Sequence, residues 1–258
     1  MNIKLIVTDL DNTLLKNNKT ISPYSAEIFK KCKEYGIKTS VATARYITGI
    51  SGFSKQILPD YQITNDGTMT FNNGNFLFGF YLELNQANDI LDTIKKENPG
   101  SYISVVNDNG IYRQPGADTV LNPASAESPS FMHRFTRPLT IPPFKIVMEC
   151  NEPALADDIA KAFNCRLIKY RNENRYAFIS QMAGKVNAIK ELTKMLSISL
   201  NDVAAFGDDM NDYDMMCQCG LSIAVSNAIN EIKNISDYIT DSNESDGVAK
   251  FIEHHFLS

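Results

Sequence analysis

Asp9-Leu10-Asp11-Asn12-Thr13 is the stretch that decides the fold, and it directly follows an apolar run from Ile3 to Val7. A run of this length and composition predicts a strand that is buried on both faces. In open α/β sheets, ligands bind at the carboxyl ends of the strands, where the connecting loops diverge. The sequence therefore predicts a chemical site immediately after this strand.

The two carboxylates of this stretch are spaced so that both can face one site. Two carboxylates this close repel each other, so keeping both ionised without a cation costs free energy. This implies a divalent metal, a shared proton, or both. The alternative is a strand that ends in an Asx turn, with Asn12 in a left-handed position. A calcium loop of the EF-hand kind is excluded, because it needs Gly where Leu14 stands and Glu where Thr20 stands.

Length and composition are those of a globular protein. The 258 residues are 43% hydrophobic and 21% charged, enough for one large domain or two modest ones. No apolar stretch approaches the roughly 18 residues that span a bilayer, so we expect no membrane insertion. No signal-peptide core precedes Asp9, and we therefore expect the protein in the cytoplasm.

Charge and cysteine usage exclude two further classes. A net charge of −5 argues against a nucleic-acid partner held by phosphate neutralisation. The cysteines have no C-x-x-C pair and are expected to be core thiols, with neither a disulfide framework nor a zinc site. They stand at positions 32, 150, 165, 217 and 219.

A βαβ unit is predicted over residues 3–42. Ser22-Pro23 marks a helix start, with Ser as N-cap and Pro at the first helical position, and Gly36 marks its end. The strand from Ile37 to Ala42 follows. The helix face expected to be apolar comprises Ala26, Phe29, Cys32 and Tyr35.

That second strand leads directly into Thr43-Ala44-Arg45. By the crevice rule, Thr43 is expected beside Asp9 and Asp11, with a hydroxyl and a backbone N–H to offer. A third strand is predicted from Tyr61 to Thr64, and Asn73-Gly74 between apolar runs predicts a hairpin.

Residues 82–180 differ in character from the rest. A helical stripe, adjacent strands and a second helix indicate an inserted α+β domain. Residues 114–143 hold six of the ten prolines and are expected to be irregular. Two acid-free basic runs, 128–148 with His133, Arg134, Arg137 and Lys145, and 159–172, could face a leaving group or simply water.

From Lys185 the alternating pattern returns, and a strand from Val203 to Phe206 ends in Gly207-Asp208-Asp209-Met210-Asn211-Asp212. Residues 1–81 and 181–258 are thus expected to build one parallel sheet. Lys185 follows Gly184, but a P-loop is excluded because Ile179 and Val186 occupy its required Gly and Ser/Thr positions.

The order Asp-x-Asp-Asn-Thr, Thr-Ala-Arg, a lone Lys opening a helix, and Gly-Asp-Asp-Met-Asn-Asp resembles the four motifs of the haloacid dehalogenase superfamily. The insertion resembles the type IIB cap of Cof-like sugar phosphatases, and residues 221–228 and 246–249 are similar to the C-terminal signatures of that branch. The resemblance implies an α/β fold: a Rossmann-like core with a parallel sheet and an inserted α+β cap.

The resemblance also implies roles for individual residues. Asp9 would be the nucleophile that forms an aspartyl-phosphate, and Asp11 the general acid and base. Asn12 replaces the usual Gly, Asp66 is an extra residue between Asn65 and Gly67, and Val186 replaces a common Gly. Mg²⁺ would be held by Asp9, the Asp11 carbonyl and Asp208, with Asp212 bonding its waters. Thr43, Lys185 and Asn211 would bind phosphate. Arg45 is expected to be an accessory residue, a salt-bridge partner that holds the Thr43 loop.

The function expected from the sequence is therefore a Mg²⁺-dependent phosphatase that acts on a small phosphorylated metabolite, a sugar phosphate in particular. A phosphotransferase or phosphomutase is the alternative that shares the aspartyl-phosphate. A non-catalytic sensor of phosphorylated metabolites is the third possibility, although it has no need of both Asp9 and Asp11. The identity of the metabolite and the oligomeric state stay open at this point.

Overall fold

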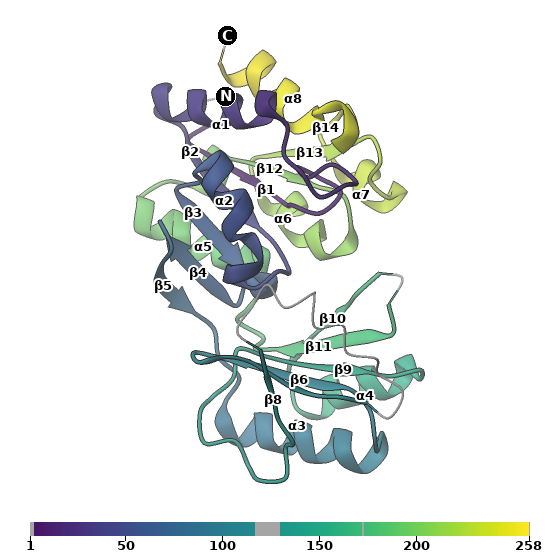
Figure 1. Cartoon of the computed structure of the whole chain (residues 1–258). Helices are drawn as coiled ribbons and strands as arrows, with labels where there is room; N and C mark the ends of the chain where they lie inside the picture. The colour runs from purple at the N-terminus through teal and green to yellow at the C-terminus, as the bar shows by residue number, and fades with distance from the viewer. Residues whose placement is uncertain (1–2, 117–129, 172, 258) are drawn as a thin grey trace. The chain divides into compact units, whose positions relative to one another are not determined.

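The chain forms two compact units (Figure 1). The structure is a computed structural model that describes residues 3–116, 130–171 and 173–257. Unit 1 combines residues 1–78 with residues 185–258, and unit 2 is the intervening segment, 79–184. The insertion predicted at 82–180 lies inside unit 2.

Unit 1 is built on an eight-stranded sheet. Its strands are β1 (Leu5–Thr8), β2 (Lys38–Ala42), β3 (Tyr61–Thr64), β4 (Met69–Asn72), β5 (Asn75–Gly79), β12 (Val203–Gly207), β13 (Leu221–Val225) and β14 (Tyr238–Thr240). They lie in the order β14-β13-β12-β1-β2-β3-β4-β5. The pairs from β14 to β3 are parallel, and β4 runs antiparallel to β3.

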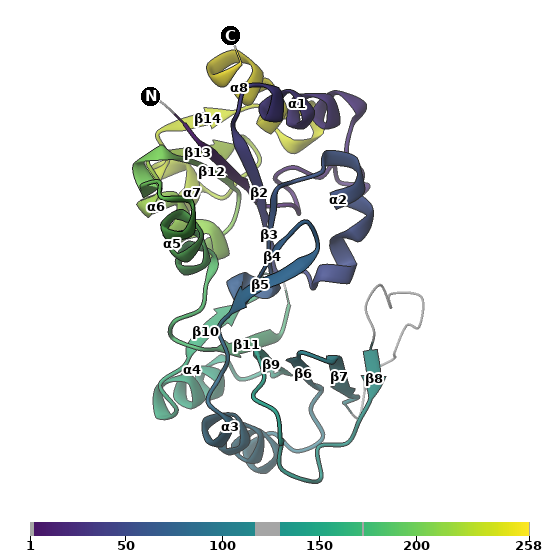
Figure 2. The same ribbon diagram turned by 90° about the vertical axis from the view of Figure 1, so that its left-hand side faces the viewer.

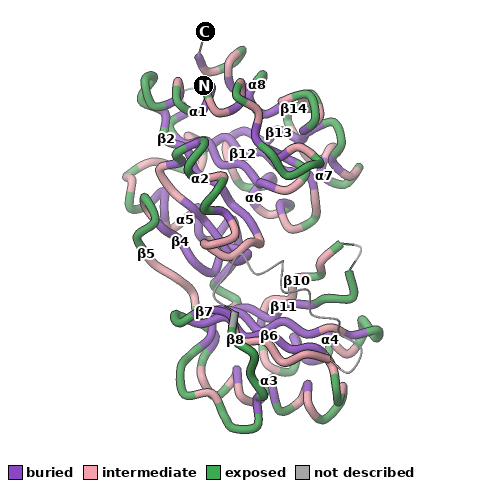
Figure 3. Tube along the Cα trace, in the orientation of Figure 1, coloured by how far each residue is buried: buried purple, intermediate pink, exposed green. Residues whose placement is uncertain are grey.

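Helices cover both faces of this sheet (Figure 2). The helices are α1 (Pro23–Glu34), α2 (Ser51–Ile57), α5 (Lys185–Leu196), α6 (Tyr213–Gln218), α7 (Asn230–Ile235) and α8 (Gly247–Phe256). Helices α1, α2 and α8 lie on one face and α5, α6 and α7 on the other, so the central strands are buried (Figure 3). The predicted α/β class with a parallel sheet is confirmed.

Local sequence signals explain several of these elements. The Ser22 side chain accepts a hydrogen bond from the N–H of Ser25 and caps α1, and Gly36 has φ = 74° just after the helix. Asn73 and Gly74 both have positive φ between β4 and β5, as a two-residue hairpin turn requires. The predicted apolar face of α1 was wrong at Tyr35, which is 58% exposed, because the helix ends before it and packs through Ser25, Ile28, Phe29 and Cys32.

Unit 2 is a six-stranded, mostly antiparallel sheet with two helices on one face (Figure 1). Its elements are α3 (Leu84–Glu97), β6 (Ile103–Asn107), β7 (Gly110–Gln114), β8 (Ser130–Met132), β9 (Lys145–Glu149), α4 (Pro153–Ala162), β10 (Arg166–Lys169) and β11 (Arg175–Ile179). The strands lie in the order β10-β11-β9-β6-β7-β8, and among the described residues only the β7–β8 pair is parallel. A hydrophobic cluster including Ile90, Ile146 and Phe178 joins sheet and helices.

Among the described residues, two α-helices and one strand were not predicted: α2, α6, and β8, which lies inside the proline-rich segment expected to be irregular. Part of that segment, 117–129, lies outside the described residues. All five cysteines are free, and Cys32, Cys150 and Cys165 are buried. The core-thiol prediction was wrong for Cys217, which is exposed on α6. No helix in the described part of the chain is long and apolar enough to cross a membrane.

Candidate active site

The strand order of unit 1 brings the predicted polar residues to one edge of the sheet. Strand β1 lies between β2 and β12, and Thr8 is in register with both Val41 and Phe206. Asp9, Thr43 and Asp208 follow directly after these three strands. Parallel strands expose their carboxyl ends at the same edge, so residues far apart in sequence meet there.

The centre of the site is a buried lysine between two carboxylates. The Nζ atom of Lys185 donates to Oδ1 of Asp9 at 2.7 Å and to Oδ1 of Asp212 at 2.6 Å. The side chains of Lys185 and Asp212 are 2% and 0% exposed. Because Oδ2 of Asp9 accepts no hydrogen bond from the described residues, that oxygen is available for chemistry.

Burial and charge act against each other in this cluster. Burial raises the pKa of Asp9 well above its usual value; the charge of Lys185 opposes the rise, and Asp212 and Asp208 add to it. Burial alone would lower the pKa of Lys185, but the charges of Asp212 and Asp9 outweigh it and raise the pKa. Lys185 therefore keeps its proton. Its single positive charge does not balance the negative charge of the three nearby carboxylates.

Asp212 is fixed by a tight turn after β12. Its Oδ2 atom accepts the backbone N–H groups of Asp208 at 3.0 Å and of Asp209 at 3.2 Å. A Cβ atom added at Gly207 would lie 2.6 Å from the Asp212 Cβ. Only glycine at position 207 leaves room for Asp212 to sit this close to the strand end.

Asp208 is 3% exposed, and Thr13 holds it. The Thr13 hydroxyl donates to Oδ1 of Asp208 at 2.8 Å, which links the first motif to the last. Burial, followed by the charge of Asp212, raises the pKa of Asp208 to about 7. A carboxyl group with such a pKa is easily protonated in the absence of a cation.

Asp9, Asp208 and Asp212 are the residues that could hold a metal ion. One oxygen from each lies within 4.8 Å of the others, and all three residues are buried. Three buried carboxylates share one buried ammonium, and burial raises the pKa of both Asp9 and Asp208. The carboxylate oxygens are hard ligands, and their negative charge exceeds the positive charge of Lys185. Both properties fit a divalent cation.

Asp11 is bound by a different pair of basic side chains, Arg45 and Lys19. Arg45 donates to both its carboxylate oxygens, from Nε to Oδ2 at 2.7 Å and from Nη2 to Oδ1 at 2.9 Å, and Lys19 Nζ lies 2.8 Å from Oδ1. Burial would raise the pKa of Asp11, but the hydrogen bonds from Arg45 and Lys19 outweigh it and lower the pKa to about 2. Asp11 is therefore ionised at neutral pH.

Thr43 and Asn211, the remaining predicted phosphate ligands, differ in their hydrogen bonds. Thr43 is buried, but its backbone N–H, expected to be available, donates to the Ile63 carbonyl at 2.9 Å. That part of the prediction was wrong, because the N–H continues the pairing of β2 with β3. The Thr43 hydroxyl accepts the N–H of Arg45 at 3.2 Å. Asn211 lies in the turn that carries Asp212 and has no hydrogen bond through its side chain within the described residues.

Two asparagines near the C-terminus were missed by the sequence analysis. Asn227 Nδ2 donates to the Asn12 carbonyl at 2.7 Å, and its Oδ1 accepts the Asn243 N–H at 3.0 Å. Asn243 Nδ2 donates to the Leu15 carbonyl at 2.9 Å. They tie down the loop after β1, in which Asn12 has φ = 59°. Their only sequence signal was the signature segment 221–228, which contains Asn227.

The chain is similar in sequence to known hydrolases along nearly its whole length. The sequence profile of the haloacid dehalogenase-like hydrolases matches residues 6–252. A pyridoxal phosphate phosphatase of Escherichia coli is 24% identical, with 100% of each chain covered. A 5-amino-6-(5-phospho-D-ribitylamino)uracil phosphatase of Bacillus subtilis is also 24% identical over 100% of this chain and 97% of its own.

Among solved structures, a sugar phosphatase of haloacid dehalogenase subclass IIB has a TM-score of 0.80. It is 17% identical, and the match covers 99% of this chain and 100% of the other. At this identity, the likeness concerns the fold.

Proposed function

Since the chain belongs to the haloacid dehalogenase-like hydrolase family, we propose that it is a Mg²⁺-dependent phosphatase of a small phosphorylated metabolite, in particular a sugar phosphate. The relatives named above act on pyridoxal phosphate and on a phosphorylated ribityl compound. Both substrates are small phosphate monoesters, which supports this substrate class.

The observation that carries the proposal is the environment of Asp9. Its Oδ1 is held by the charged Lys185 at 2.7 Å, while Oδ2 is left without a partner in the described chain. Oδ2 is the oxygen that attacks phosphorus, giving an aspartyl-phosphate as the bond from phosphorus to the leaving oxygen breaks. Lys185 then offsets negative charge on the phosphoryl oxygens, with Thr43 and Asn211 as further phosphate ligands.

The buried carboxylates supply the place for Mg²⁺. Asp9, Asp208 and the Asp11 carbonyl would hold the ion, and Asp212 would bond its waters. When bound, Mg²⁺ supplies positive charge that offsets the repulsion between an anionic nucleophile and an anionic phosphoryl group. Without such a charge, burial raises the pKa of Asp9 and so favours the protonated form of the nucleophile.

Asp11 moves the protons of the reaction. In the first step it gives a proton to the leaving oxygen, and in the second it takes one from the water that cleaves the aspartyl-phosphate. One water is consumed, and inorganic phosphate and an alcohol are released. Since Arg45 and Lys19 keep Asp11 ionised, these pairs must loosen before Asp11 can act as the acid.

The proposal is tested with purified protein and a panel of sugar phosphates and pyridoxal phosphate. Released inorganic phosphate is measured with Mg²⁺ and with EDTA, for the parent, Asp9→Asn, and the control Asp92→Asn, whose side chain is 72% exposed in α3. We expect release by the parent and by Asp92→Asn that requires Mg²⁺, and only a trace from Asp9→Asn. Undiminished release after chelation, or full activity of Asp9→Asn, would contradict the proposal. Transfer of the phosphoryl group within the sugar, with little free phosphate, would indicate the mutase alternative.

A further inference from the structure

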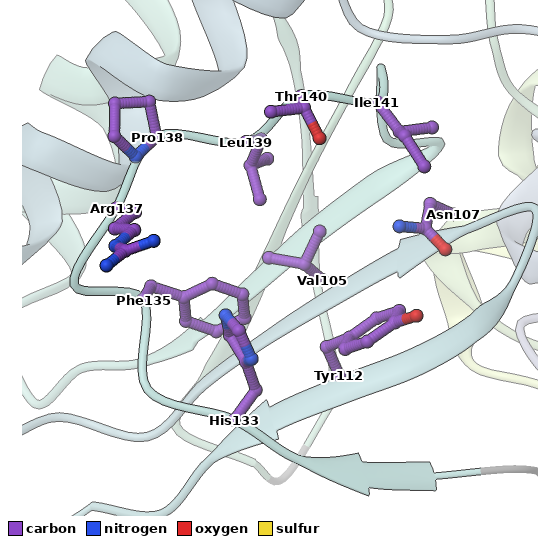
Figure 4. Close-up of a pocket in the computed structure, with 10 residues that line it drawn as sticks. All are labelled: Val105, Asn107, Tyr112, His133, Phe135, Arg137, Pro138, Leu139, Thr140 and Ile141. Atoms are coloured by element: carbon purple, nitrogen blue, oxygen red, sulfur yellow. The ribbon is translucent and has the colours of Figure 1, made fainter.

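Unit 2 contains a pocket that lies outside the candidate active site (Figure 4). The cavity has a volume of about 230 Å³ and is lined by β6, β7 and the segment 133–141. Val105 forms part of its floor and belongs to the hydrophobic cluster beneath α3 and α4. The pocket therefore lies on the helix-bearing face of the unit 2 sheet.

The walls of this pocket are fixed by hydrogen bonds. Asn88 of α3 both donates to the Leu139 carbonyl at 3.2 Å and accepts the Leu139 N–H at 2.6 Å. The Phe135 N–H donates to Oε1 of Gln114 at 3.1 Å, and the Phe135 ring is buried. The segment is thus held in place on both sides of the cavity, so the pocket is formed before any ligand binds.

Asn107 presents a hydrogen-bond donor at one end of the pocket. This residue is 7% exposed, and its Oδ1 accepts the N–H of Asn109 at 2.9 Å, which fixes the orientation of the amide. Figure 4 shows the amide nitrogen turned toward the inside of the pocket. Nδ2 makes no hydrogen bond within the described residues. The side chain is more than nine-tenths buried, so this N–H donor can be satisfied by an acceptor on a bound ligand.

Arg137 stands at the opposite end (Figure 4). The segment 133–141 carries His133, Arg134 and Arg137 and no acidic residue. In the part of the chain that the structure describes, Arg137 has no ion pair with a carboxylate. A planar guanidinium without a carboxylate partner matches the two oxygens of a carboxylate ligand.

Aromatic rings line the space between these two ends. Tyr112 and His133 have ring centroids 5.8 Å apart at 83°, and His133 and Phe135 lie 4.9 Å apart at 63°. Leu139 closes the opposite side. A cavity of about 150 Å³ is enough for benzene, so this one accommodates a single substituted ring.

We propose that this pocket binds a small aromatic carboxylate, with its carboxylate at Arg137, its ring among Tyr112, His133 and Phe135, and a hydrogen-bond acceptor at Asn107. The lining comes from unit 2 alone, and the inference does not depend on the proposed phosphatase activity. The site would give the protein a second ligand, unrelated to phosphate esters.

The test uses the full chain and 4-acetylbenzoate, which carries a carboxylate, one ring and a ketone acceptor. Binding is followed by ¹H–¹⁵N NMR titration, including the side-chain amide of Asn107. We expect saturable shifts at residues of the pocket. Relative to this probe, 4-acetylbenzamide, which lacks the anion, and 4-ethylbenzoate, which lacks the acceptor, should each bind about tenfold more weakly.

Variants locate the contacts. Arg137→Gln should weaken 4-acetylbenzoate about tenfold, whereas the control Arg134→Gln, in the same segment but outside the pocket lining, should leave binding within about twofold. Asn107→Asp keeps an acceptor for the Asn109 N–H but replaces the donor, so it should weaken 4-acetylbenzoate about tenfold and 4-ethylbenzoate much less. No saturable shift up to about 10 mM, or equal binding of all three probes to the parent, would overturn the proposal even if a variant failed to fold.

Discussion

Arg45 holds Asp11 through two hydrogen bonds, one to each carboxylate oxygen, at 2.7 and 2.9 Å. Such a paired geometry is the strongest form of contact between a guanidinium and a carboxylate. It keeps Asp11, the proposed proton carrier, ionised. The sequence analysis regarded Arg45 as accessory to the Thr43 loop, and the structure assigns it a direct contact with Asp11.

Removing Arg45 should raise the pKa of Asp11. The pKa of about 2 results from hydrogen bonds and charge that outweigh burial, so Arg45→Ala should move the midpoint upward by about one unit or more. Arg45→Lys keeps a positive charge and should shift it less. Carboxyl ¹³C NMR titration of the metal-free variants measures the midpoint. An Asp11 that stays ionised to equally low pH in Arg45→Ala would contradict the role given to this contact.

Gly207→Ala should disturb the centre of the site without removing any of its charged groups. The new Cβ would lie 2.6 Å from the Cβ of Asp212, which is close to the backbone and cannot swing away. We expect kcat/KM to fall by about 10²-fold, as a displacement of about 1 Å can cause. The control is Gly52→Ala, because nothing lies within 4 Å of its added Cβ. Equal activity of the two variants would show that the fit of Asp212 against Gly207 does not matter.

Asn227→Ala should loosen the loop that follows β1. The variant loses an exposed hydrogen bond to the Asn12 carbonyl and a partly buried one from the Asn243 N–H. We expect kcat to fall about fivefold, with KM changed less, because the loop positions Asp9 and Asp11 rather than binding the leaving group. Asn227→Asp, which keeps only the acceptor for Asn243, should recover part of the loss. A rise in KM with kcat unchanged would contradict the proposed positioning role of Asn227.

Stability should depend on pH through Asp208. Its pKa in the metal-free protein is about 7 against an ordinary 3.8, so the folded state binds more protons than the unfolded state between these values. This contribution is fully present below about pH 4 and is lost as pH rises through 7. Metal-free stability should therefore fall over this range.

Mg²⁺ should offset that loss, because it takes the place of the proton. Mg²⁺ at about 100 times its Kd at pH 8 should raise Tm by roughly 5 to 10 °C at pH 8, and the same Mg²⁺ concentration should raise it by less at pH 5, where Mg²⁺ competes with the proton on Asp208. Thermal melts with and without Mg²⁺ measure the difference, and Asp208→Asn should flatten it. A Tm shift by Mg²⁺ that is the same at both pH values would contradict the assignment of Asp208 to the metal.

Much of the fold could be predicted because local signals agreed with the final packing. Apolar runs that end in polar motifs predicted β1, β2 and β12, and their parallel arrangement brings Asp9, Thr43 and Asp208 to one edge. Ser22 and the Asn73-Gly74 turn act through neighbours a few residues away, which a sequence can reveal. The predicted roles of these site residues stay predictions.

What could not be predicted depends on contacts between distant segments. Asn227 is hydrogen-bonded to Asn12, which lies 215 positions away in the sequence, and Thr13 is hydrogen-bonded to Asp208, which lies 195 positions away. The pairing of β2 with β3 consumes the Thr43 N–H, which nothing in its own motif indicates. Helix α2 carries a short, largely exposed segment without a clear apolar stripe, and its only buried residue is Ile57.

The most direct test of the central claim is to trap the phosphoryl group on Asp9. Asp11→Asn should lack the base that activates water, so a nitrophenyl phosphate, whose leaving group needs no proton, should give a burst of nitrophenolate followed by slow turnover. Rapid mixing with acid quench, followed by peptide mass spectrometry, would locate the modification. We predict one phosphoryl group per chain on Asp9 in Asp11→Asn and none in Asp9→Asn. Slow steady turnover from the first cycle, with no burst and no phosphorylated peptide, would contradict the role of Asp9 as nucleophile.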